Sequence, residues 1–235
     1  MSESKKTAIV TGASSGIGYA IALNLLLDGW CVYGLDQKKV NLNNTQFHSI
    51  EIDLNDTQEL KRVLDLILGS VVPSAVVHAA GLLRVGSLGD LDFQAGDLMW
   101  RTHVEVASKL ADRILPAMIS KGFGRMILIG SRVSVGIAHR SQYAATKAAL
   151  VSLARSWAAE VISAGVTVNV ISPAATDTPM LVDPTRSSRA PQTPPIGRLI
   201  KPEEVASLTL YLLGENAGAI TGQDIAICGG SSVTR

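Results

Sequence analysis

Net charge and aromatic residues are both scarce in this chain. Its 235 residues carry a formal net charge of +1, and Phe, Trp and Tyr together make up 4% of them. The sequence therefore lacks the basic stripe with interleaved aromatic residues that is typical of nucleic-acid-binding surfaces. This scarcity predicts a protein with no nucleic-acid partner.

Cysteines and long apolar runs are scarce as well. The two cysteines, Cys31 and Cys228, fall in predicted buried strands, where they resemble core residues rather than a disulfide or metal site. No apolar run is long enough to cross a bilayer, and residues 1–6 hold no apolar core of a secretory leader. Together these absences predict a cytoplasmic protein with neither a metal site nor a membrane partner.

What the chain does have is a regular alternation of apolar strands and helices, with 47% hydrophobic residues. The alternation predicts a single α/β domain over 1–235, a doubly wound parallel sheet of about seven strands with helices on both faces. The predicted strands are 8–10, 31–35, 47–52, 75–78, 125–129, 167–171 and 224–227. The predicted helices are 19–27, 57–68, 97–121, 141–163 and 202–213. In such sheets ligands bind beyond the carboxyl ends of the strands, so we expect the site there.

The first strand runs into a glycine-rich turn. Glycines stand at positions 12, 16 and 18, between the predicted strand and an apolar helix. Glycines let the backbone approach a pyrophosphate, and a helix N-terminus offers N–H groups with a favourable dipole. The spacing G-x-x-x-G-x-G is a variant of the dinucleotide fingerprint. It predicts a phosphate cradle, the alternative being a turn that only packs the helix on the strand.

The second strand ends at Asp36. An acidic residue about 20 positions after the glycines accepts hydrogen bonds from the adenosine ribose in dinucleotide folds. It would also repel the extra phosphate of NADP. Asp36 therefore favours NAD over NADP, although Lys38 and Lys39 lie close enough to offset its charge. The alternative is an ordinary loop carboxylate.

Tyr143 and Lys147 stand four positions apart in a segment rich in helix formers. At this spacing the two side chains lie one turn apart on the same helix face. An ammonium group near a phenol favours the phenolate and lowers its pKa, which brings the tyrosine toward acid–base chemistry near neutral pH. The pair predicts a catalytic acid–base, the alternative being a spacing that arises by chance.

A proline-rich stretch, 177–195, separates the sixth strand from the last helix. Five of the nine prolines lie in it, at positions 179, 184, 191, 194 and 195. Long loops of this kind in compact domains often cover a binding site. We therefore predict a short substrate lid near 177–197, with a disordered surface excursion as the alternative.

Over essentially its whole length the chain resembles a short-chain dehydrogenase/reductase. The motifs that carry the resemblance are Thr11-Gly-Ala-Ser-Ser-Gly-Ile-Gly18, Asp53-Leu54, Ala79-Ala-Gly81, Ser131, Tyr143-Ala-Ala-Thr-Lys147, Asn169, Ser172-Pro173, Thr178, Ile220-Thr-Gly222 and Gly229-Gly230. The resemblance implies an NAD-dependent oxidoreductase of a secondary alcohol or ketone. It also implies a homodimer or homotetramer paired through the two long helices, by positions such as Val104, Ala107, Leu110, Ala148, Val151 and Leu153.

The resemblance also implies residue roles. Tyr143 would be the general acid in reduction and the base in oxidation. Lys147 would bind the nicotinamide ribose and lower the tyrosine pKa, and Ser131 would hydrogen-bond the substrate oxygen. The implied cofactor contacts are Gly12, Ser14, Ser15, Gly16, Ile17, Gly18, Asp36, Asp53, Leu54, Ala79, Ala80, Gly81, Tyr143, Lys147, Pro173, Thr176 and Thr178. Other roles stay open, because Ser131 could cap a turn, Asp53 could cap the helix near Thr57, and Thr178 could be a turn hydroxyl.

Two histidines depart from the family pattern. His78-Ala-Ala-Gly81 stands where such enzymes usually read Asn-Asn-Ala-Gly, and His103 replaces a helix asparagine that normally holds a water linked to the lysine. An imidazole can donate, accept and titrate near neutrality. His103 is therefore predicted to take over the water contact or shorten a proton relay, with simple helix packing as the alternative.

The sequence gives only a general indication of the substrate. Arg84, Arg132, His139 and Arg140 fall on loops near the expected pocket, and Arg186 and Arg189 fall in the predicted lid, so an anionic substrate is one alternative. Short strings at 34–37, 80–84 and 175–178 are similar to family members that oxidise a dihydrodiol-type cyclic hydroxy acid. Reductases of 3-oxoacyl carrier-protein thioesters are another resemblance, although Asp36 disfavours their usual NADP. A non-catalytic dinucleotide-binding regulator with the same fold is the alternative to an enzyme.

Overall fold

The computed structural model describes residues 6–40, 42–182 and 192–233. Its sheet has seven strands in the order β3-β2-β1-β4-β5-β6-β7, and each neighbouring pair is parallel. The strands are β1 Thr7–Thr11, β2 Cys31–Asp36, β3 Phe47–Glu51, β4 Ala75–His78, β5 Gly124–Ile129, β6 Val166–Pro173 and β7 Asp224–Ile227. Single-domain, doubly wound Rossmann-like architecture is thus confirmed.

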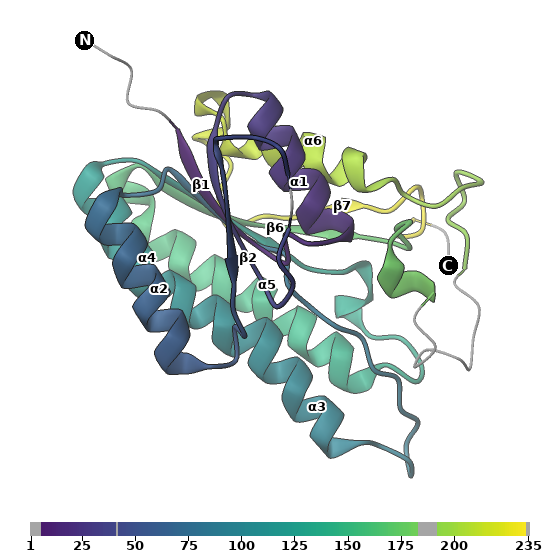
Figure 1. Ribbon diagram of the computed structural model, residues 1–235. Coiled ribbons are helices and arrows are strands. Elements are labelled where there is room, and N and C mark those ends of the chain that lie inside the picture. Colours follow the sequence, from purple (N-terminus) through teal and green to yellow (C-terminus); the bar gives the residue numbers. More distant parts are fainter. Residues whose placement is uncertain (1–5, 41, 183–191, 234–235) are drawn as a thin grey trace.

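Helices cover both faces of the sheet (Figure 1). They are α1 Gly16–Leu27, α2 Thr57–Ser70, α3 Phe93–Trp100, α4 Val106–Lys121, α5 Ser141–Val161 and α6 Pro202–Leu213. On one face α1 and α6 pack over the sheet through buried residues such as Leu25 and Leu212. On the other face α2, α4 and α5 do so through Leu60, Leu110 and Leu150. Central strands covered on both faces consist largely of apolar residues, which explains why the sequence revealed them.

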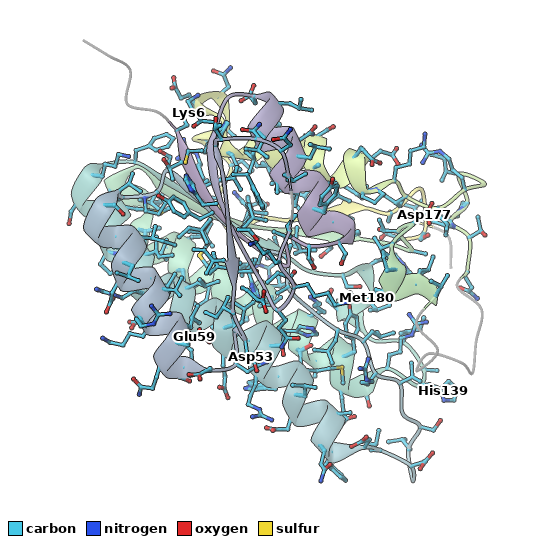
Figure 2. The ribbon with its side chains drawn as sticks, viewed as in Figure 1. Lys6, Asp53, Glu59, His139, Asp177 and Met180 are labelled. Carbon is cyan, nitrogen blue, oxygen red and sulfur yellow. The ribbon has the colours of Figure 1, made fainter. Side chains whose placement is uncertain are left out.

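The strand order reverses between β1 and β4, because β1 pairs with β2 on one side and with β4 on the other. Ligands of doubly wound sheets bind at such a switch point, outside the carboxyl ends of the strands. Figure 2 shows this polarity: Lys6 precedes β1 at one end of the sheet, whereas His139, Met180 and Asp177 lie toward the other end. The loops that carry the predicted site therefore meet at one edge.

The predicted helix 97–121 is wrong in its start and its continuity. The helix begins at Phe93, because the side chain of Asp92 accepts a hydrogen bond from Ala95 N (2.9 Å) and caps it. A π-helical segment, Arg101–Glu105, then separates α3 from α4. We call this segment the π-turn. Single π-helical turns widen a helix locally and often occur at functional sites.

Other differences are smaller. Helix α1 begins at Gly16, directly after the turn, and α5 ends at Val161 before a 3-10 turn. Several strands extend by one or two residues beyond the predicted bounds, because hydrogen-bonded ladders continue past the most apolar residues. Cys31 lies in β2, but Cys228 follows β7 rather than lying in it, and both cysteines are half-buried. None of the described helices is both long enough and apolar enough to span a membrane.

The six apolar positions predicted to pair two copies differ in their burial. Val104, Ala107 and Leu110 are buried within the chain's own core. On α5, by contrast, Ala148 is exposed and Val151 and Leu153 are half-buried. The α5 positions leave apolar surface for a second copy, and pairing through these helices stays a prediction.

Candidate active site

A cavity of about 1360 Å³ opens at the carboxyl edge of the sheet. Every residue that the sequence assigned to catalysis or cofactor binding lies on its wall, from the glycine turn after β1 to Thr178 after β6. The described flanks of the predicted lid also line it, through Met180, Leu181, Gln192, Thr193 and Pro195. The centre of that lid, 183–191, lies outside the described residues, and so do Arg186 and Arg189.

The glycine turn forms a narrow cradle. Gly12 has φ +70°, and a Cβ atom there would lie 2.8 Å from the backbone of Ala80. A Cβ atom on Gly18 would overlap the carbonyl oxygen of Gly12, so only glycine lets α1 pack this closely on the turn. Ser15 precedes α1 in an extended conformation, and the first turn of α1 holds no acidic residue. The N–H groups at this helix end suit an anion such as a pyrophosphate.

Asp36 is fixed at the end of β2 by two backbone N–H groups. Its Oδ2 accepts a hydrogen bond from Ser14 N (3.0 Å), and its Oδ1 accepts one from Lys38 N (3.1 Å). The carboxylate is half-buried and lies beside the glycine cradle, on the wall of the cavity. A fixed carboxylate at this point can accept hydrogen bonds from a ribose diol.

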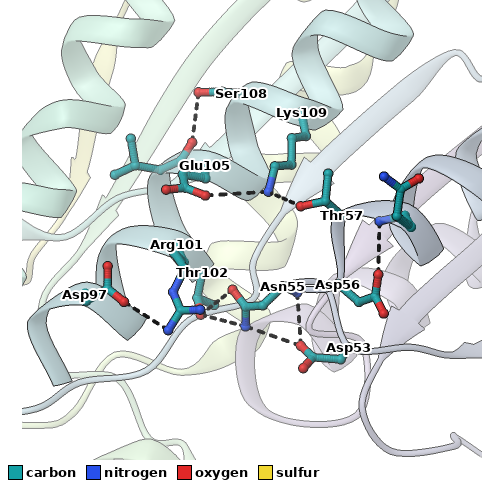
Figure 3. A network of polar contacts seen from close by, with 12 residues as sticks. Asp53, Asn55, Asp56, Thr57, Asp97, Arg101, Thr102, Glu105, Ser108 and Lys109 are labelled. Carbon is teal, nitrogen blue, oxygen red and sulfur yellow. Dashed lines mark hydrogen bonds and ion pairs between the residues drawn. The ribbon is translucent and has the colours of Figure 1, made fainter. Parts of the chain in front are cut away.

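Asp53 lies on the wall next to Leu54 and is tied to the π-turn (Figure 3). Its Oδ1 accepts hydrogen bonds from Asn55 N (3.0 Å) and Gln37 Nε2 (3.1 Å), and the backbone bond from Asn55 lowers the pKa of Asp53. The Asn55 side chain in turn bonds Thr102 Oγ1 of the π-turn (3.2 Å). The idea that Asp53 caps α2 is wrong, because Asp56 accepts from Gln58 N and Glu59 N at 3.0 Å each.

Tyr143 and Lys147 lie one turn apart on α5, both buried but on the cavity wall. Lys147 Nζ donates a hydrogen bond to the carbonyl oxygen of Ile129 at the end of β5 (2.8 Å). The same nitrogen lies 5.7 Å from the centre of the Tyr143 ring. Burial lowers the pKa of Lys147 from its ordinary value of 10.5 to about 7. This lysine can therefore change its charge near neutral pH, within reach of a phenol.

Two hydroxyl groups also fit the local roles that the sequence left open. Ser131 follows β5 and caps a 3-10 turn, where its Oγ accepts a hydrogen bond from Val133 N (3.4 Å). Accepting that bond leaves the hydroxyl proton available for a group in the cavity. Thr178 Oγ1 donates to the carbonyl oxygen of Thr176 (3.4 Å), as a turn hydroxyl does.

His103 projects from the π-turn toward Tyr143 and is fully buried. Its Nε2 accepts a hydrogen bond from Leu82 N (3.0 Å), and its Nδ1 lies 2.8 Å from Thr146 Oγ1. Its ring meets the Tyr143 ring edge-on, with centres 5.7 Å apart and planes at 85°. Because both ring nitrogens bond protein groups, a water relay through His103 would have to break one of these bonds.

His78 is the site residue whose role the sequence did not reveal. Its Nδ1 lies 2.8 Å from Thr11 Oγ1, and its Nε2 lies 3.1 Å from the carbonyl oxygen of Thr102. Desolvation, aided by the charge of Lys147, lowers the pKa of His78 to about 3. The signals in the sequence were its departure from the family's Asn-Asn-Ala-Gly pattern and its place as a polar residue at the end of an otherwise apolar strand.

Charged residues are spread unevenly over the wall of the cavity, and Lys38 lies beside Asp36. Among the described residues that line it, the carboxylates are Asp36 and Asp53, both beside the loops after β2 and β3. The basic residues predicted to lie near the pocket do line the cavity, in the part formed by the loops after β4 and β5. They are Arg84, Arg132, His139 and Arg140. Arg132 Nη1 donates to Ser231 O (3.3 Å), and His139 Nδ1 lies 2.7 Å from Ser87 Oγ. No group of three metal-ligating side chains occurs within the described parts of the chain.

Comparisons with known proteins agree with this geometry. A family model described as enoyl-(acyl carrier protein) reductase matches residues 12–232. The 3-oxoacyl-[acyl-carrier-protein] reductase FabG of Salmonella typhimurium is 34% identical, with 98% of each chain covered. The 2,3-dihydro-2,3-dihydroxybenzoate dehydrogenase of Escherichia coli is 32% identical, with 99% of each covered. A solved variant of actinorhodin polyketide ketoreductase with NADPH is similar at a TM-score of 0.90 and 25% identity, with 98% of each chain covered.

Proposed function

The chain belongs to the short-chain dehydrogenase/reductase family of oxidoreductases, and from this membership we propose that it transfers hydride between NAD and a secondary alcohol or its ketone. One observation carries the proposal. The buried Lys147 lies beside Tyr143 on the wall of a cavity that also contains the glycine cradle and Asp36. An acid–base pair and a dinucleotide cradle in one cavity are the two parts that this reaction needs.

The residues of the cradle fit a dinucleotide. Side chains at Gly12 and Gly18 would clash with the backbone of Ala80 and of the turn itself, so glycine at both positions lets the turn and the start of α1 pack closely at the cavity, where a pyrophosphate would approach. Asp36 would accept hydrogen bonds from the adenosine ribose, and Asp53 would face the adenine. The cofactor, when bound, supplies the carbon that accepts or gives up the hydride.

The chain's own residues would handle the proton and the alignment. In oxidation Tyr143 would take the hydroxyl proton of the alcohol, and in reduction it would return a proton to the carbonyl oxygen. The Lys147 ammonium would stabilise the phenolate, and the Ser131 hydroxyl would hold the substrate oxygen in place. Preorganised donors of this kind act where charge develops, and they account for much of the rate.

For the substrate we favour a compound that carries an anionic group. Three basic residues of the wall lie between Ser131 and Tyr143 in the sequence, namely Arg132, His139 and Arg140, and Arg140 immediately precedes α5. The names of two relatives support different compounds of this kind: one is a reductase of 3-oxoacyl carrier protein and the other a dehydrogenase of 2,3-dihydro-2,3-dihydroxybenzoate. We therefore rank a cyclic hydroxy acid and a 3-oxoacyl thioester as the leading candidates.

Binding and turnover can be measured separately. We expect NADH to bind, as followed by nicotinamide fluorescence, and the absorbance at the nicotinamide band to change with a member of a panel. The panel would contain acetoacetyl-coenzyme A, offered with NADH, and cyclic dihydrodiol carboxylates and their esters, offered with NAD, with cyclohexanediols as uncharged counterparts. Binding without turnover on any member would favour the dinucleotide-binding regulator instead. A failure to bind either nicotinamide cofactor would contradict both functions.

Replacing Asp36 with alanine should weaken the binding of NAD more than the binding of NADP. The variant loses a carboxylate that accepts hydrogen bonds from the ribose, and such bonds to charged groups are worth about 1.5–3 kcal/mol. We expect the dissociation constant for NADH to rise by about 10–100-fold, and the NADPH/NADH affinity ratio to shift toward NADPH. Fluorescence titration with both cofactors measures the ratio directly.

Glu51→Ala provides the matched control for this change. Glu51 stands opposite Asp36 in the register of β2 and β3, is exposed, and does not line the cavity. Its loss changes the net charge by the same amount as the loss of Asp36. The control should leave both affinities unchanged. An equal shift in the two variants would mean that long-range charge, rather than a ribose contact at Asp36, sets the preference.

A further inference from the structure

We propose that His78 and His103 are positioning residues that form one neutral, hydrogen-bonded chain through the π-turn and hold the cofactor-side loop after β4 in register with Tyr143. This inference rests on the proposed function, because it names what aligns that function's acid–base residue. The chain is defined by contacts among seven residues of five elements: Thr11, His78, Ala79, Leu82, His103, Thr146 and Tyr143.

The first link fixes the proton of His78. Thr11 Oγ1 accepts hydrogen bonds from Ala79 N and Ala80 N, each at 3.1 Å. With both lone pairs occupied, this hydroxyl has only its own proton left for His78 Nδ1, which lies 2.8 Å away. His78 Nδ1 is therefore an acceptor, and its proton sits on Nε2.

The second link, through the π-turn, requires the same assignment independently. His78 Nε2 lies 3.1 Å from the carbonyl oxygen of Thr102 and 3.2 Å from that of His103. Carbonyl oxygens only accept, so Nε2 must carry the proton. The two carbonyls belong to consecutive residues of the π-turn, so His78 ties the end of β4 to this turn.

The third link fixes the proton of His103 on the opposite nitrogen. Leu82 N donates to Nε2, so in the neutral ring the proton lies on Nδ1 and is donated to Thr146 Oγ1. Thr146 in turn donates its hydroxyl proton to the carbonyl oxygen of Tyr143 at 2.8 Å. Donors and acceptors therefore alternate without conflict in two runs, one from Ala79 to the carbonyl of His103 and one from Leu82 to Tyr143, and the covalent frame of His103 joins them.

Adding a proton to either ring would break this order. A proton on His78 Nδ1 would point at the Thr11 hydroxyl, whose lone pairs are already occupied. A proton on His103 Nε2 would point at the N–H group of Leu82. Burial and the nearby Lys147 charge both oppose such protonation, and they lower the pKa of His103 well below its ordinary value. A Cβ atom on Gly81 would lie 3.0 Å from His103 Nε2 and 3.7 Å from Lys147 Nζ, so the loop, the histidine and the lysine share one small volume.

The His103 ring can hold the catalytic groups in position without touching the reacting atoms. His103 holds the backbone after Gly81 on one side and the first turns of α5 on the other, and both line the cavity. A misplacement of about 1 Å can cost about 100-fold in rate. The histidines should therefore act on kcat far more than on the Michaelis constant for the cofactor.

Three substitutions of His103 separate the contacts. Asn can still donate near Nδ1 to Thr146, Gln can still accept near Nε2 from Leu82 N, and Leu can do neither. We expect kcat to fall by about 100-fold in H103L and by less in H103N and H103Q, with the Michaelis constant for NADH changed less than threefold. His48→Asn is the control, because His48 is exposed and stacks on Tyr33 outside the cavity.

Nitrogen NMR of the histidine rings tests the chain without turnover. In the wild-type protein we expect the Nε2–H form for His78 and the Nδ1–H form for His103, both unchanged from pH 5 to pH 9. H78N and H103N combined should lower kcat by less than the product of their separate effects, since they interrupt one chain. Thermal melting would confirm that each variant is folded.

Failure of this inference can be told apart from failure of the proposed function. Either histidine titrating near pH 6.5, or carrying its proton on the other nitrogen, would overturn the inference even in an active enzyme. Wild-type kcat in H103L would overturn it too, as would strictly multiplicative losses in the double variant. A wild-type protein that turns over nothing would remove the proposed function, while the ring NMR would still decide the chain.

Discussion

Replacing Tyr143 with phenylalanine is expected to lower kcat by about 1000-fold while NADH affinity changes less than threefold. The variant loses the phenol that exchanges a proton with the substrate oxygen, and general acid–base groups contribute about 10²–10⁴-fold. The ring itself remains, so the edge-on contact with His103 and the contact with the Lys147 ammonium are kept. Steady-state rates with the responsive panel substrate and fluorescence titration with NADH give the two numbers.

Tyr33→Phe is the matched control for this experiment. Tyr33 lies in β2, stacks on His48 with ring centres 4.8 Å apart, and does not line the cavity. Its substitution removes one phenol elsewhere and should leave kcat unchanged. If Tyr143→Phe kept more than a tenth of the wild-type kcat, Tyr143 would not be the proton-transfer group.

Much of the fold could be predicted because its signals are local. Strands that are covered on both faces, such as β5 and β6, are buried along their whole length and consist largely of apolar residues, and α1 and α6 follow turn and proline signals. The π-turn could not be predicted in the same way. Its carbonyls bond the ring of His78, a residue about 25 positions away that only the folded sheet brings near.

In the candidate site, too, some features could be predicted from the sequence and others could not. Gly12, Asp36 and Ser131 each follow a strand, and parallel strands bring their carboxyl ends to one edge, so the pattern alone placed them together. The position of the proton on the His103 ring could not be predicted in this way. Which of its nitrogens carries a proton depends on Leu82 and Thr146, and the second of these lies on another helix. The sequence could name the residue but not its partners.

Replacing Lys147 with methionine is expected to lower kcat by about 100-fold or more and to make the free protein more stable at pH 6. The lysine pKa falls from 10.5 in the unfolded chain to about 7 in the folded one, so burial of its charge opposes folding. Below pH 7 both states hold the proton and the full penalty applies. Removing it should stabilise the fold by on the order of 2 kcal/mol, after allowing for the donor lost at Ile129 O.

The sign of this effect should change with pH. Between about pH 7 and pH 10.5 the unfolded chain binds one proton more than the folded chain, so the stability of the wild-type protein rises with pH. Near pH 10.5 its neutral lysine still donates to Ile129 O, whereas the variant leaves that carbonyl unpaired and should be the less stable protein. Urea unfolding at a series of pH values measures the crossing.

Lys121→Met separates burial from charge in this comparison. Lys121 also donates to a backbone carbonyl, Val72 O at 3.2 Å, but its side chain is exposed. Its loss should change stability by less than about 0.5 kcal/mol across the same pH range. Parallel pH curves for wild type and Lys147→Met would mean that the lysine is not desolvated. Because the buried ammonium group destabilises the fold while it supports the chemistry of Tyr143, replacing Lys147 should lower activity and raise stability at every pH below the crossing.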